Sequence, residues 1–419
     1  MSLAVLALLA LLAAIALSMT SRLNIGLLAL AFAWLLGVYF GHLDPKVVLE
    51  GFPTSLFVTL AGVMLLFAIT EANQTLERVA HGIIYFARGD SRVLPLFFFL
   101  IPCVVASVGP GSICAVAVVA PLAMRIGQQS GISPFLTSLM VANGAAAGNL
   151  SPISAVGIIA NTKMAEAGLV GHEWRVFLAN FIAHTAVALI AYAIMGFRRT
   201  RPEVDLVASL PANGTAFDAK QRTTLLVLAI WIVGVVVLQL HIGLSAFAAA
   251  CLLIILRAAD EPNAIRQMSW SVILMVCGVS TLIALVEKTG GMELFVSLLA
   301  RFSSPETVNG FMAGVTGAIS TYSSTSGVVL PAFLPTVPGL VEQLGGGDPL
   351  AISLSINIGS ALVDVSPLST LGALCLAAAP GLTATDTRKL FNQLLTWGFG
   401  MTLVGAAFCQ FFAGPLSRM

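Results

Sequence analysis

Charged side chains are scarce in this chain. Asp, Glu, Lys and Arg make up 9% of its 419 residues, whereas hydrophobic residues make up 58%. Because soluble domains carry roughly 25% charged residues, this much apolar surface cannot be buried by folding in water alone. The net charge of +1 and the lack of a basic cluster give no indication of a nucleic-acid partner. The sequence therefore predicts an all-α polytopic membrane protein, with the bilayer as its solvent.

Catalytic and metal-binding motifs are also missing. The chain has no Gly-x-Ser-x-Gly, no His-Glu-x-x-His, no paired intramembrane aspartates and no Walker A sequence. Its six cysteines lie in apolar segments, and no two have the spacing of metal ligands, so we interpret them as small buried hydrophobes. We therefore expect neither an enzyme nor an ATP-driven pump, and no cofactor apart from Na⁺ or H⁺ as a coupling ion.

Long apolar segments are abundant by contrast. The first of them, residues 3–19, lacks a basic n-region and a cleavage site, so we expect a retained membrane helix and not a signal peptide. Ten segments have spanning length: about 3–19, 22–41, 53–70, 134–161, 176–197, 223–240, 243–256, 269–286, 349–379 and 389–413.

Two further apolar segments, about 94–124 and 308–341, are each interrupted by small and polar residues. The interruptions run from Ser107 to Ser112 and from Ser320 to Gly327. Irregular backbone at membrane depth is tolerated only where protein or water covers it. We therefore predict two re-entrant hairpins that enter and leave on the same side of the membrane.

The chain divides into two similar halves. A polar stretch, residues 198–222, separates residues 1–197 from residues 223–419, and each half holds five spans, one hairpin and one broken helix. Because five is odd, the second half must enter the membrane inverted, which predicts inverted repeats. Amphipathic segments at 75–88 and 290–301 are expected to lie along the two interfaces.

Basic residues predict the orientation of these halves. With the linker in the cytoplasm, most of the 20 Lys and Arg residues fall on the cytoplasmic side, as the positive-inside rule requires. Both termini then face outward. The expected location is a bacterial-type inner (cytoplasmic) membrane, which the chain crosses many times.

Two short stretches of almost the same sequence interrupt the segments 134–161 and 349–379. One runs from Asn149 to Ser154 and the other from Asp364 to Ser369, and each contains a Ser-Pro step. Serine followed by proline favours an N-cap and a first helical turn, so Ser151 and Ser366 are predicted to start second half-helices. Simple proline kinks that shape the bundle are the alternative interpretation.

Half-helix ends that meet near the midplane of the membrane carry partial charges from their free backbone N–H and C=O groups, without any charged side chain. A free N-terminus suits an anion and a free C-terminus suits a cation. Two positive poles that face one site would suit a dicarboxylate. The predicted substrate-binding residues are Ser112, Asn149, Ser151, Pro152, Ser154, Ser324, Thr325, Ser366, Pro367 and Ser369. The predicted cation-binding residues are Ser107, Gly148, Ser320, Ser323, Gly359 and Asp364.

Asp364 is the most informative single residue. A carboxylate at membrane depth costs about 2.5–3.5 kcal/mol on insertion scales, so it is usually retained for function. It could bind Na⁺ or carry a coupling proton, or remain a neutral hydrogen-bonded group. His184, within another span, is expected to be packed and hydrogen-bonded rather than a proton relay.

This order of hairpin, broken helix and linker, repeated inverted, resembles the ion transporter superfamily. Within it the chain resembles the divalent anion/sodium symporters and, more closely, the malonate/dicarboxylate carriers of the MatC type. In the symporters each hairpin tip carries Ser-Asn-Thr, which contacts Na⁺ and a substrate carboxylate. The second tip here reads Ser323-Ser324-Thr325, with the asparagine replaced. At the first tip, Ser107 and Ser112 flank Gly109-Pro110-Gly111 instead.

The resemblance implies a secondary carrier of small organic dianions, such as malonate or succinate. It also implies Na⁺- or H⁺-coupled symport, a homodimer and an elevator mechanism. An organic-anion exchanger or exporter on the same fold is the alternative, since an exchanger needs no coupling ion. A passive channel or a permease that works with a soluble binding protein stays open as well.

Overall fold

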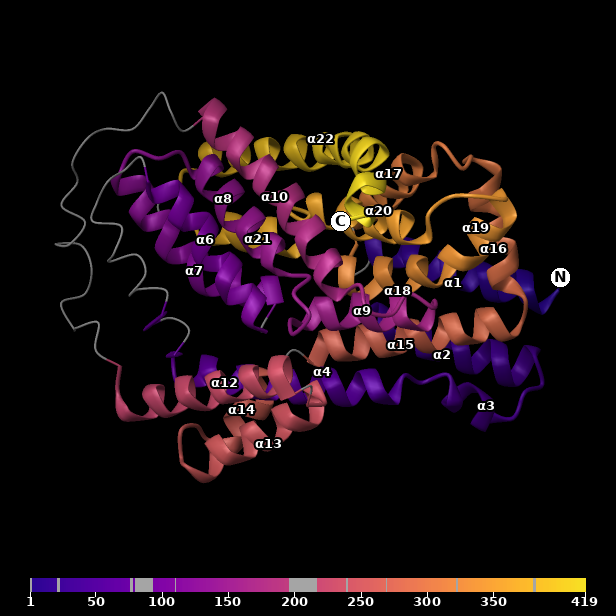
Figure 1. Ribbon diagram of the computed structural model, residues 1–419, viewed down its shortest axis with the longest axis horizontal. Helices are drawn as coiled ribbons and strands as arrows, with labels where there is room; N and C mark the ends of the chain where they lie inside the picture. Colours follow the sequence, from indigo (N-terminus) through magenta and orange to yellow (C-terminus); the bar gives the residue numbers. More distant parts are fainter. Residues whose placement is uncertain are drawn as a thin grey trace.

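Helices account for all the regular secondary structure that the computed structural model describes (Figure 1). The described residues are 2–20, 23–75, 78–79, 93–109, 111–195, 217–238, 240–268, 270–321, 323–379 and 382–419. Most of the linker and of the amphipathic segment 75–88 therefore lies outside them, as do Pro110 and Tyr322 at the hairpin tips. The predicted all-α fold is confirmed, and no strand occurs among these residues.

The first half contains α1 to α10. Their bounds are α1 (Leu3–Thr20), α2 (Ile25–Trp34), the π-helix η1 (Leu35–Phe40), α3 (Pro45–Glu50), α4 (Thr54–Ala72), α6 (Leu94–Val108), α7 (Gly111–Gln129), α8 (Pro134–Gly148), α9 (Ala155–Glu166) and α10 (Glu173–Met195).

The second half contains α12 to α22. Their bounds are α12 (Ala219–Leu238), α13 (Ile242–Ile255), α14 (Glu261–Gln267), α15 (Trp270–Lys288), α16 (Gly291–Arg301), α17 (Val308–Ser320), the π-helix η2 (Thr325–Val329), α18 (Leu330–Phe333), the 3₁₀-helix η3 (Leu334–Thr336), α19 (Val337–Leu344), α20 (Pro349–Leu362), α21 (Thr370–Ala377) and α22 (Ala384–Ser417).

Each predicted span coincides with a helix or a pair of helices. In the described part, six helical segments are long and apolar enough to cross a membrane: α4, α7, α10, α15, the stretch Thr325–Leu344, and α22. The sequence missed the short helices α3 and α14, because a helix of six or seven residues is too short to show an apolar period. It also placed the ends of α22 several residues too far inward.

Side chains and prolines start several of these helices. Ser133 accepts a hydrogen bond from the Leu136 backbone N–H at the start of α8, and Asp348 accepts one from that of Leu350 at the start of α20. In both helices the first residue is proline, Pro134 and Pro349, whose fixed φ angle suits the first turn. Local chemistry alone therefore sets these two starts.

Glycines allow equivalent helix crossings in the two halves. Gly62 of α4 packs against the backbone of Gly243 of α13, and Gly278 of α15 packs against that of Gly26 of α2. In the next helices, Gly144 of α8 packs against the Phe99 backbone where α6 and α8 cross, and Gly359 of α20 packs against the Ala313 backbone where α17 and α20 cross. A side chain at these glycines would force the helices apart, so glycine is required at each of these crossings.

The half-helices that follow the two breaks pack against the opposite half. In Figure 1, α21 lies beside α7 and α8, whereas α9 lies near α18 of the second half as well as α4 of its own. Val365, Leu371 and Cys375 accordingly belong to the hydrophobic core of α6, α7 and α8. Leu150 and Ile159 belong to the other core. The two halves are therefore interlocked at their breaks.

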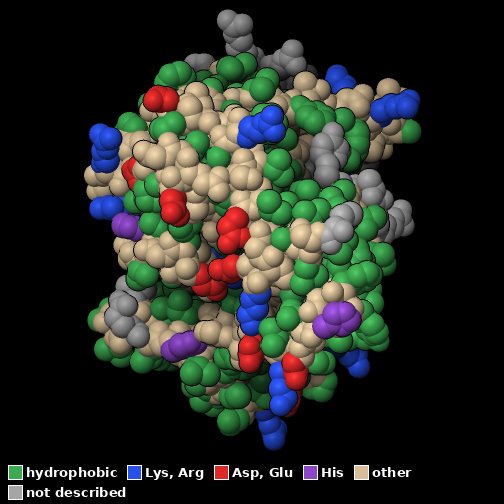
Figure 2. Space-filling view, turned by 90° about the vertical axis from the view of Figure 1, so that its right-hand side faces the viewer, with side chains coloured by type: hydrophobic (Ala, Val, Ile, Leu, Met, Phe, Trp, Pro, Cys, Tyr) green, Lys and Arg blue, Asp and Glu red, His purple; other side chains and the backbone are tan. Residues whose placement is uncertain are grey.

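Charged side chains lie at the end of the bundle that carries α3, α16 and α19. Figure 2 views the end at which α3, α16 and α19 lie, and it shows Lys, Arg, Asp and Glu side chains spread over that surface. There Lys288 of α15 forms an ion pair with Glu50 of α3 at 3.4 Å. A charged end is expected where a multi-pass membrane protein meets water.

Candidate functional site

The first break joins the tip of the first hairpin to the broken helix. The Ser112 backbone N–H donates to Asn149 Oδ1 at 3.0 Å, and the Ala155 N–H donates to the Gly109 carbonyl at 3.1 Å. Gly111 has φ +81°, a conformation that favours glycine and lets α7 begin directly beyond the tip. Asn149 therefore holds the start of α7 against the end of α8.

The second half-helices begin later than the Ser-Pro steps. We predicted Ser151 and Ser366 as N-caps, but α9 begins at Ala155 and α21 at Thr370, with Ser154 and Ser369 as the capping positions. The prediction was wrong because a chain of turns follows each break, in which the Ser154 N–H bonds to the Ser151 carbonyl. Pro152 and Pro367 lie in these turns.

Two hydroxyl groups at the first break are left without an internal hydrogen bond in the described part of the chain. Ser112 and Ser151 are 5% and 6% exposed, and neither hydroxyl has a hydrogen-bond partner among the residues that the structure describes. Ser154, in contrast, donates to the Ser151 carbonyl at 2.9 Å and accepts from the Gly157 N–H at 3.0 Å. The N-terminus of α9 is thus capped by the protein itself.

The predicted cation ligands of the first half are used in packing. The Ser107 hydroxyl donates to the Cys103 carbonyl of its own helix at 2.7 Å, and Gly148 packs against the Cys103 backbone. The carbonyls of Ala146 and Ala147, at the negative end of α8, accept from the Asn180 side-chain amide at 2.8 and 3.3 Å. A neutral amide therefore occupies the pole where a cation would be expected.

The second break surrounds Asp364 with hydroxyl donors. Thr325 donates to Asp364 Oδ1 at 2.9 Å and Ser369 donates to the same oxygen at 3.2 Å. The Ser320 hydroxyl is bonded to that of Thr325, which is also 3.2 Å from the Ser360 carbonyl. Asp364 is 7% exposed and the other four residues are equally buried or more so. The structure thus brings three predicted cation or substrate residues together around one carboxylate.

The N-terminus of α21 is left open as a result. Because the Ser369 hydroxyl points to Asp364, it does not cap α21. The backbone N–H groups of Thr370, Leu371 and Gly372 have no hydrogen-bond partner in the described part of the chain. Free N–H groups at a helix start carry partial positive charge and suit an anion. An anion-attracting pole therefore lies next to a buried carboxylate.

The remaining predicted residues have local roles. The Ser324 hydroxyl accepts from the Gly327 N–H and caps η2, beside the buried Ser323. The Ser366 hydroxyl accepts from the Leu368 N–H at 3.3 Å, and Ser366 packs against Gly398 of α22. Gly359 lies in the crossing of α17 and α20, so its contribution there is packing.

Sequence reasoning missed Asn180, Ser360 and Asn143. The amide Oδ1 of Asn143 contacts His184 Nδ1 at 3.1 Å, and both residues are fully buried. His184 is thus packed and hydrogen-bonded, as expected. Asn180 and His184 are four residues apart in an apolar helix, so they share one face. Two polar residues on one face of a membrane span are a usable signal for a buried contact.

The breaks of the two halves lie close to the same interface. Asn357 of α20 contacts Met164 of α9, with Nδ2 and Sδ 3.6 Å apart. Cys375 of α21 contacts the Ser138 carbonyl of α8 at 3.9 Å. Each half-helix that follows a break therefore contacts the helix that precedes the other break. Among the described residues, no three His, Cys, Asp or Glu side chains cluster in a way that could hold a metal ion.

One family model matches the first part of the chain. Residues 1–149 match the family model of the dicarboxylate carrier protein MatC N-terminus. The resemblance to MatC-type carriers is confirmed over that part of the chain. A search of curated protein sequences finds no match.

Two solved transporter structures share the fold. The YdaH transporter of Alcanivorax borkumensis is 14% identical, with a TM-score of 0.60 over 90% of this chain and 89% of that one. MtrF of Neisseria gonorrhoeae, described with a class of antimetabolite efflux pumps, is 13% identical, with a TM-score of 0.58 over 90% of this chain and 84% of that one. At these identities the likeness shows the fold. Together with the family match it supports a carrier function in a multi-pass membrane protein.

Proposed function

We propose that this protein is a secondary active carrier of small organic dianions. The substrate class is a dicarboxylate such as malonate or succinate, and transport is coupled to Na⁺ or H⁺. The observation that carries the proposal is the pairing at the second break: the buried Asp364 carboxylate lies beside the open N-terminus of α21.

This pairing favours coupling for an electrostatic reason. Two unit negative charges about 4 Å apart repel by roughly 4 kcal/mol at an effective dielectric constant near 20. An anion at the α21 pole and an ionised Asp364 therefore destabilise each other unless a cation or a proton is bound as well. Occupancy of the cation site and of the anion site then favour each other, which is the thermodynamic condition for symport.

A dianion is favoured because the site offers two kinds of donor. The N–H groups at the start of α21 suit one carboxylate. The free hydroxyls of Ser112 and Ser151, at the first break, suit a second. The interlocked half-helices support the placement of both groups at one interface. We propose that one coupling cation binds at Asp364, since Asn180 occupies the corresponding pole in the first half.

Two separately packed groups of helices support an elevator mechanism, and the resemblance to MatC-type carriers is the basis for proposing a homodimer. The crossings of α4 with α13 and of α2 with α15 join one group of helices. Helices α6 to α8, α10, α17 and α20 to α22 form another group that carries both breaks. We propose that the second group moves against the first, with the linker on the cytoplasmic side and the halves inverted in the membrane.

Uptake into proteoliposomes tests the function. Radiolabelled malonate and succinate should accumulate when an inward Na⁺ or pH gradient is imposed, and accumulation should collapse when an ionophore dissipates that gradient. Uptake that occurs only when the vesicles are preloaded with unlabelled substrate would instead establish an exchanger. Absence of transport for C3 to C6 dicarboxylates under every gradient would contradict the proposed substrate class.

Ser151→Ala should weaken substrate binding without weakening the fold. The Ser151 hydroxyl has no internal partner among the described residues, so its removal deprives only the ligand of a hydrogen bond. Hydrogen bonds to a charged group contribute about 1.5–3 kcal/mol, which predicts a rise in KM of roughly tenfold or more. Uptake kinetics and thermal stability are measured together.

Ser138→Ala is the matched control for this variant. The Ser138 hydroxyl bonds to the Pro134 carbonyl in the same helix, away from the break, so its KM should stay at the wild-type value. An unchanged KM in Ser151→Ala would remove Ser151 from the substrate site.

A further inference from the structure

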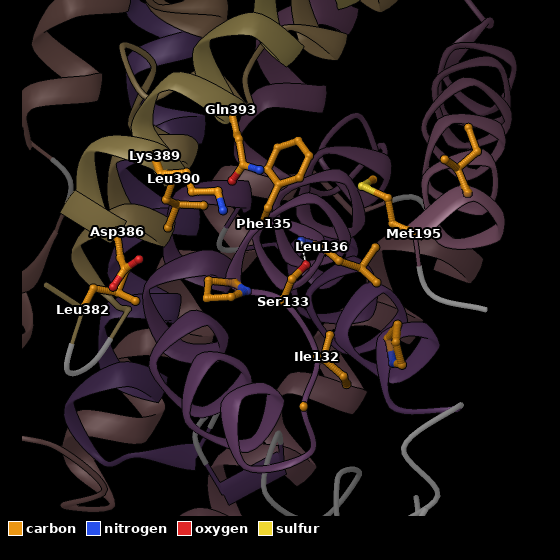
Figure 3. Close-up of a pocket in the computed structure, with 14 residues that line it drawn as sticks. Ile132, Ser133, Phe135, Leu136, Met195, Leu382, Asp386, Lys389, Leu390 and Gln393 are labelled. Carbon is orange, nitrogen blue, oxygen red and sulfur yellow. Dashed lines mark hydrogen bonds between the residues drawn. The ribbon is translucent and has the colours of Figure 1, made fainter. Parts of the chain in front are cut away.

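A groove runs along the first half of α22, at the end of the molecule where α8 begins. Two adjoining cavities form it, about 650 and 720 Å³ in volume, and both are lined by Phe135, Lys389 and Gln393. Figure 3 shows Lys389 and Gln393 of α22 across from Phe135 and Leu136 of α8 and from Ser133, which caps that helix. The groove is therefore shared by two helices of different halves, and its volume is in the range of small-molecule sites.

The charge at the mouth of the groove is positive. Arg388 and Lys389 are exposed, and neither forms an ion pair with any residue that the structure describes. The nearby Asp386 is the hydrogen-bond acceptor of the Thr383 hydroxyl at 2.7 Å, within the cap of α22. Asn392 and Gln393 add amide donors one turn further along the helix. An anionic group is the complement of this end.

The groove becomes apolar with distance from this end. Trp397 packs edge-on against Phe135 with ring centroids 6.0 Å apart, and Met401 and Val404 line the next turns. At 1.5 Å per residue, Asn392 and Val404 are about 18 Å apart along the helix, close to one leaflet of a roughly 30 Å hydrocarbon core. Leu403, on the outer side of this helix, is 74% exposed, as expected for a surface that faces lipid.

We propose that the groove binds an anionic phospholipid. Its phosphate lies at Arg388 and Lys389, its glycerol and ester groups lie at Asn392 and Gln393, and one acyl chain follows the helix past Gly400 to Val404. Charge-assisted hydrogen bonds from Arg and Lys to phosphate supply the headgroup preference. The site does not depend on the proposed substrate or on its coupling ion.

Native mass spectrometry of the full-length protein in detergent tests the headgroup end. We expect palmitoyl-oleoyl phosphatidylglycerol to bind at least about tenfold more tightly than the phosphatidylcholine with the same chains, since each basic side chain contributes roughly 1 kcal/mol toward an anionic lipid. Arg388→Gln/Lys389→Gln should abolish that preference.

The matched control is Lys220→Gln/Arg266→Gln. It removes the same charge from two exposed residues that do not line the groove, so the lipid preference should persist. Equal loss in both variants, or equal binding of the two lipids by the wild-type protein, would overturn the proposal. Binding of glycerol 3-phosphate as tight as that of the whole lipid would overturn it too, because the apolar part of the groove would then be unused.

Gly400→Leu tests the acyl-chain end. A Cβ atom at Gly400 meets nothing within 4 Å, so leucine fills the groove without distorting the helix. Gly414→Leu is the control, since Gly414 lies in the same helix, is equally open and does not line the groove. Phosphatidylglycerol binding should fall in the first variant alone. Unchanged lipid binding in Gly400→Leu would overturn the proposal. It would also be overturned if this variant changed the oligomeric state of the protein without losing lipid, because a second copy of the chain would then cover the groove.

Discussion

Asp364→Asn is expected to abolish gradient-driven accumulation while leaving the protein folded. Asparagine keeps an oxygen that can accept from Thr325 and Ser369, so the hydrogen bonds around the second break persist. The negative charge that would balance a bound cation is lost. Removing one partner of a buried charge pair costs about 3–5 kcal/mol, so the apparent affinity for the coupling ion should fall on the order of 100-fold or more. Initial rates of dicarboxylate uptake against Na⁺ concentration and against pH measure this.

Asp348→Asn is the control for this experiment. Asp348 caps the other end of α20 by accepting from the Leu350 N–H at 2.9 Å, and asparagine caps helices equally well. The initial rate of dicarboxylate uptake by Asp348→Asn should depend on Na⁺ concentration and on pH as that of the wild-type protein does. Should the Asp364→Asn protein keep the wild-type dependence on both ions, Asp364 would be a structural residue and the coupling proposal would fail.

Substitution of the crossing glycines should give the largest loss of stability. A Cβ atom at Gly359 would lie 2.5 to 2.8 Å from backbone atoms of Ala313, and one at Gly144 would lie 2.8 Å from backbone carbons of Phe99. Backbone atoms cannot rotate away as a side chain can, so α20 and α8 would each be pushed off the neighbouring helix. Overpacking of this kind costs about 1–3 kcal/mol for a small group and more for a large one.

Alanine at either glycine should therefore lower the thermal unfolding midpoint, and leucine should prevent recovery of monodisperse protein. Gly414→Ala is the control, because this substitution should not lower the thermal unfolding midpoint. It meets nothing within 4 Å, and alanine is favoured over glycine by roughly 1 kcal/mol inside a helix, so its midpoint should stay or rise. A fall of the same size at Gly414 as at Gly359 would show that the effect is not due to the crossing.

The positions of the helices could be predicted from sequence because each depends on local properties. Apolar length predicted the segments that start at residues 134 and 349, and the structure shows that α8 and α20 begin there, behind Ser133 and Asp348 caps. The repeat was predicted from the same order of spans, hairpin and broken helix in both halves, and the close crossings at Gly62, Gly278, Gly144 and Gly359 became apparent in the structure. The starts of α9 and α21 were placed too early, because the turns at each break use the Ser-Pro steps that would otherwise cap a helix.

The sequence by itself determined that the chain is an all-helical membrane protein, and it predicted two similar halves with a carboxylate at the second break. Composition, apolar length and repeated short motifs are local properties that need no knowledge of neighbours. Only the tertiary structure decided which hydroxyl groups are free and which pole of each half-helix is open. Ser369 could have capped α21, yet its hydroxyl points to Asp364, and Asn180 comes from another helix to occupy the end of α8. A hydrogen-bond donor can serve one acceptor or another, and that choice depends on atoms that are distant in sequence and brought together by packing.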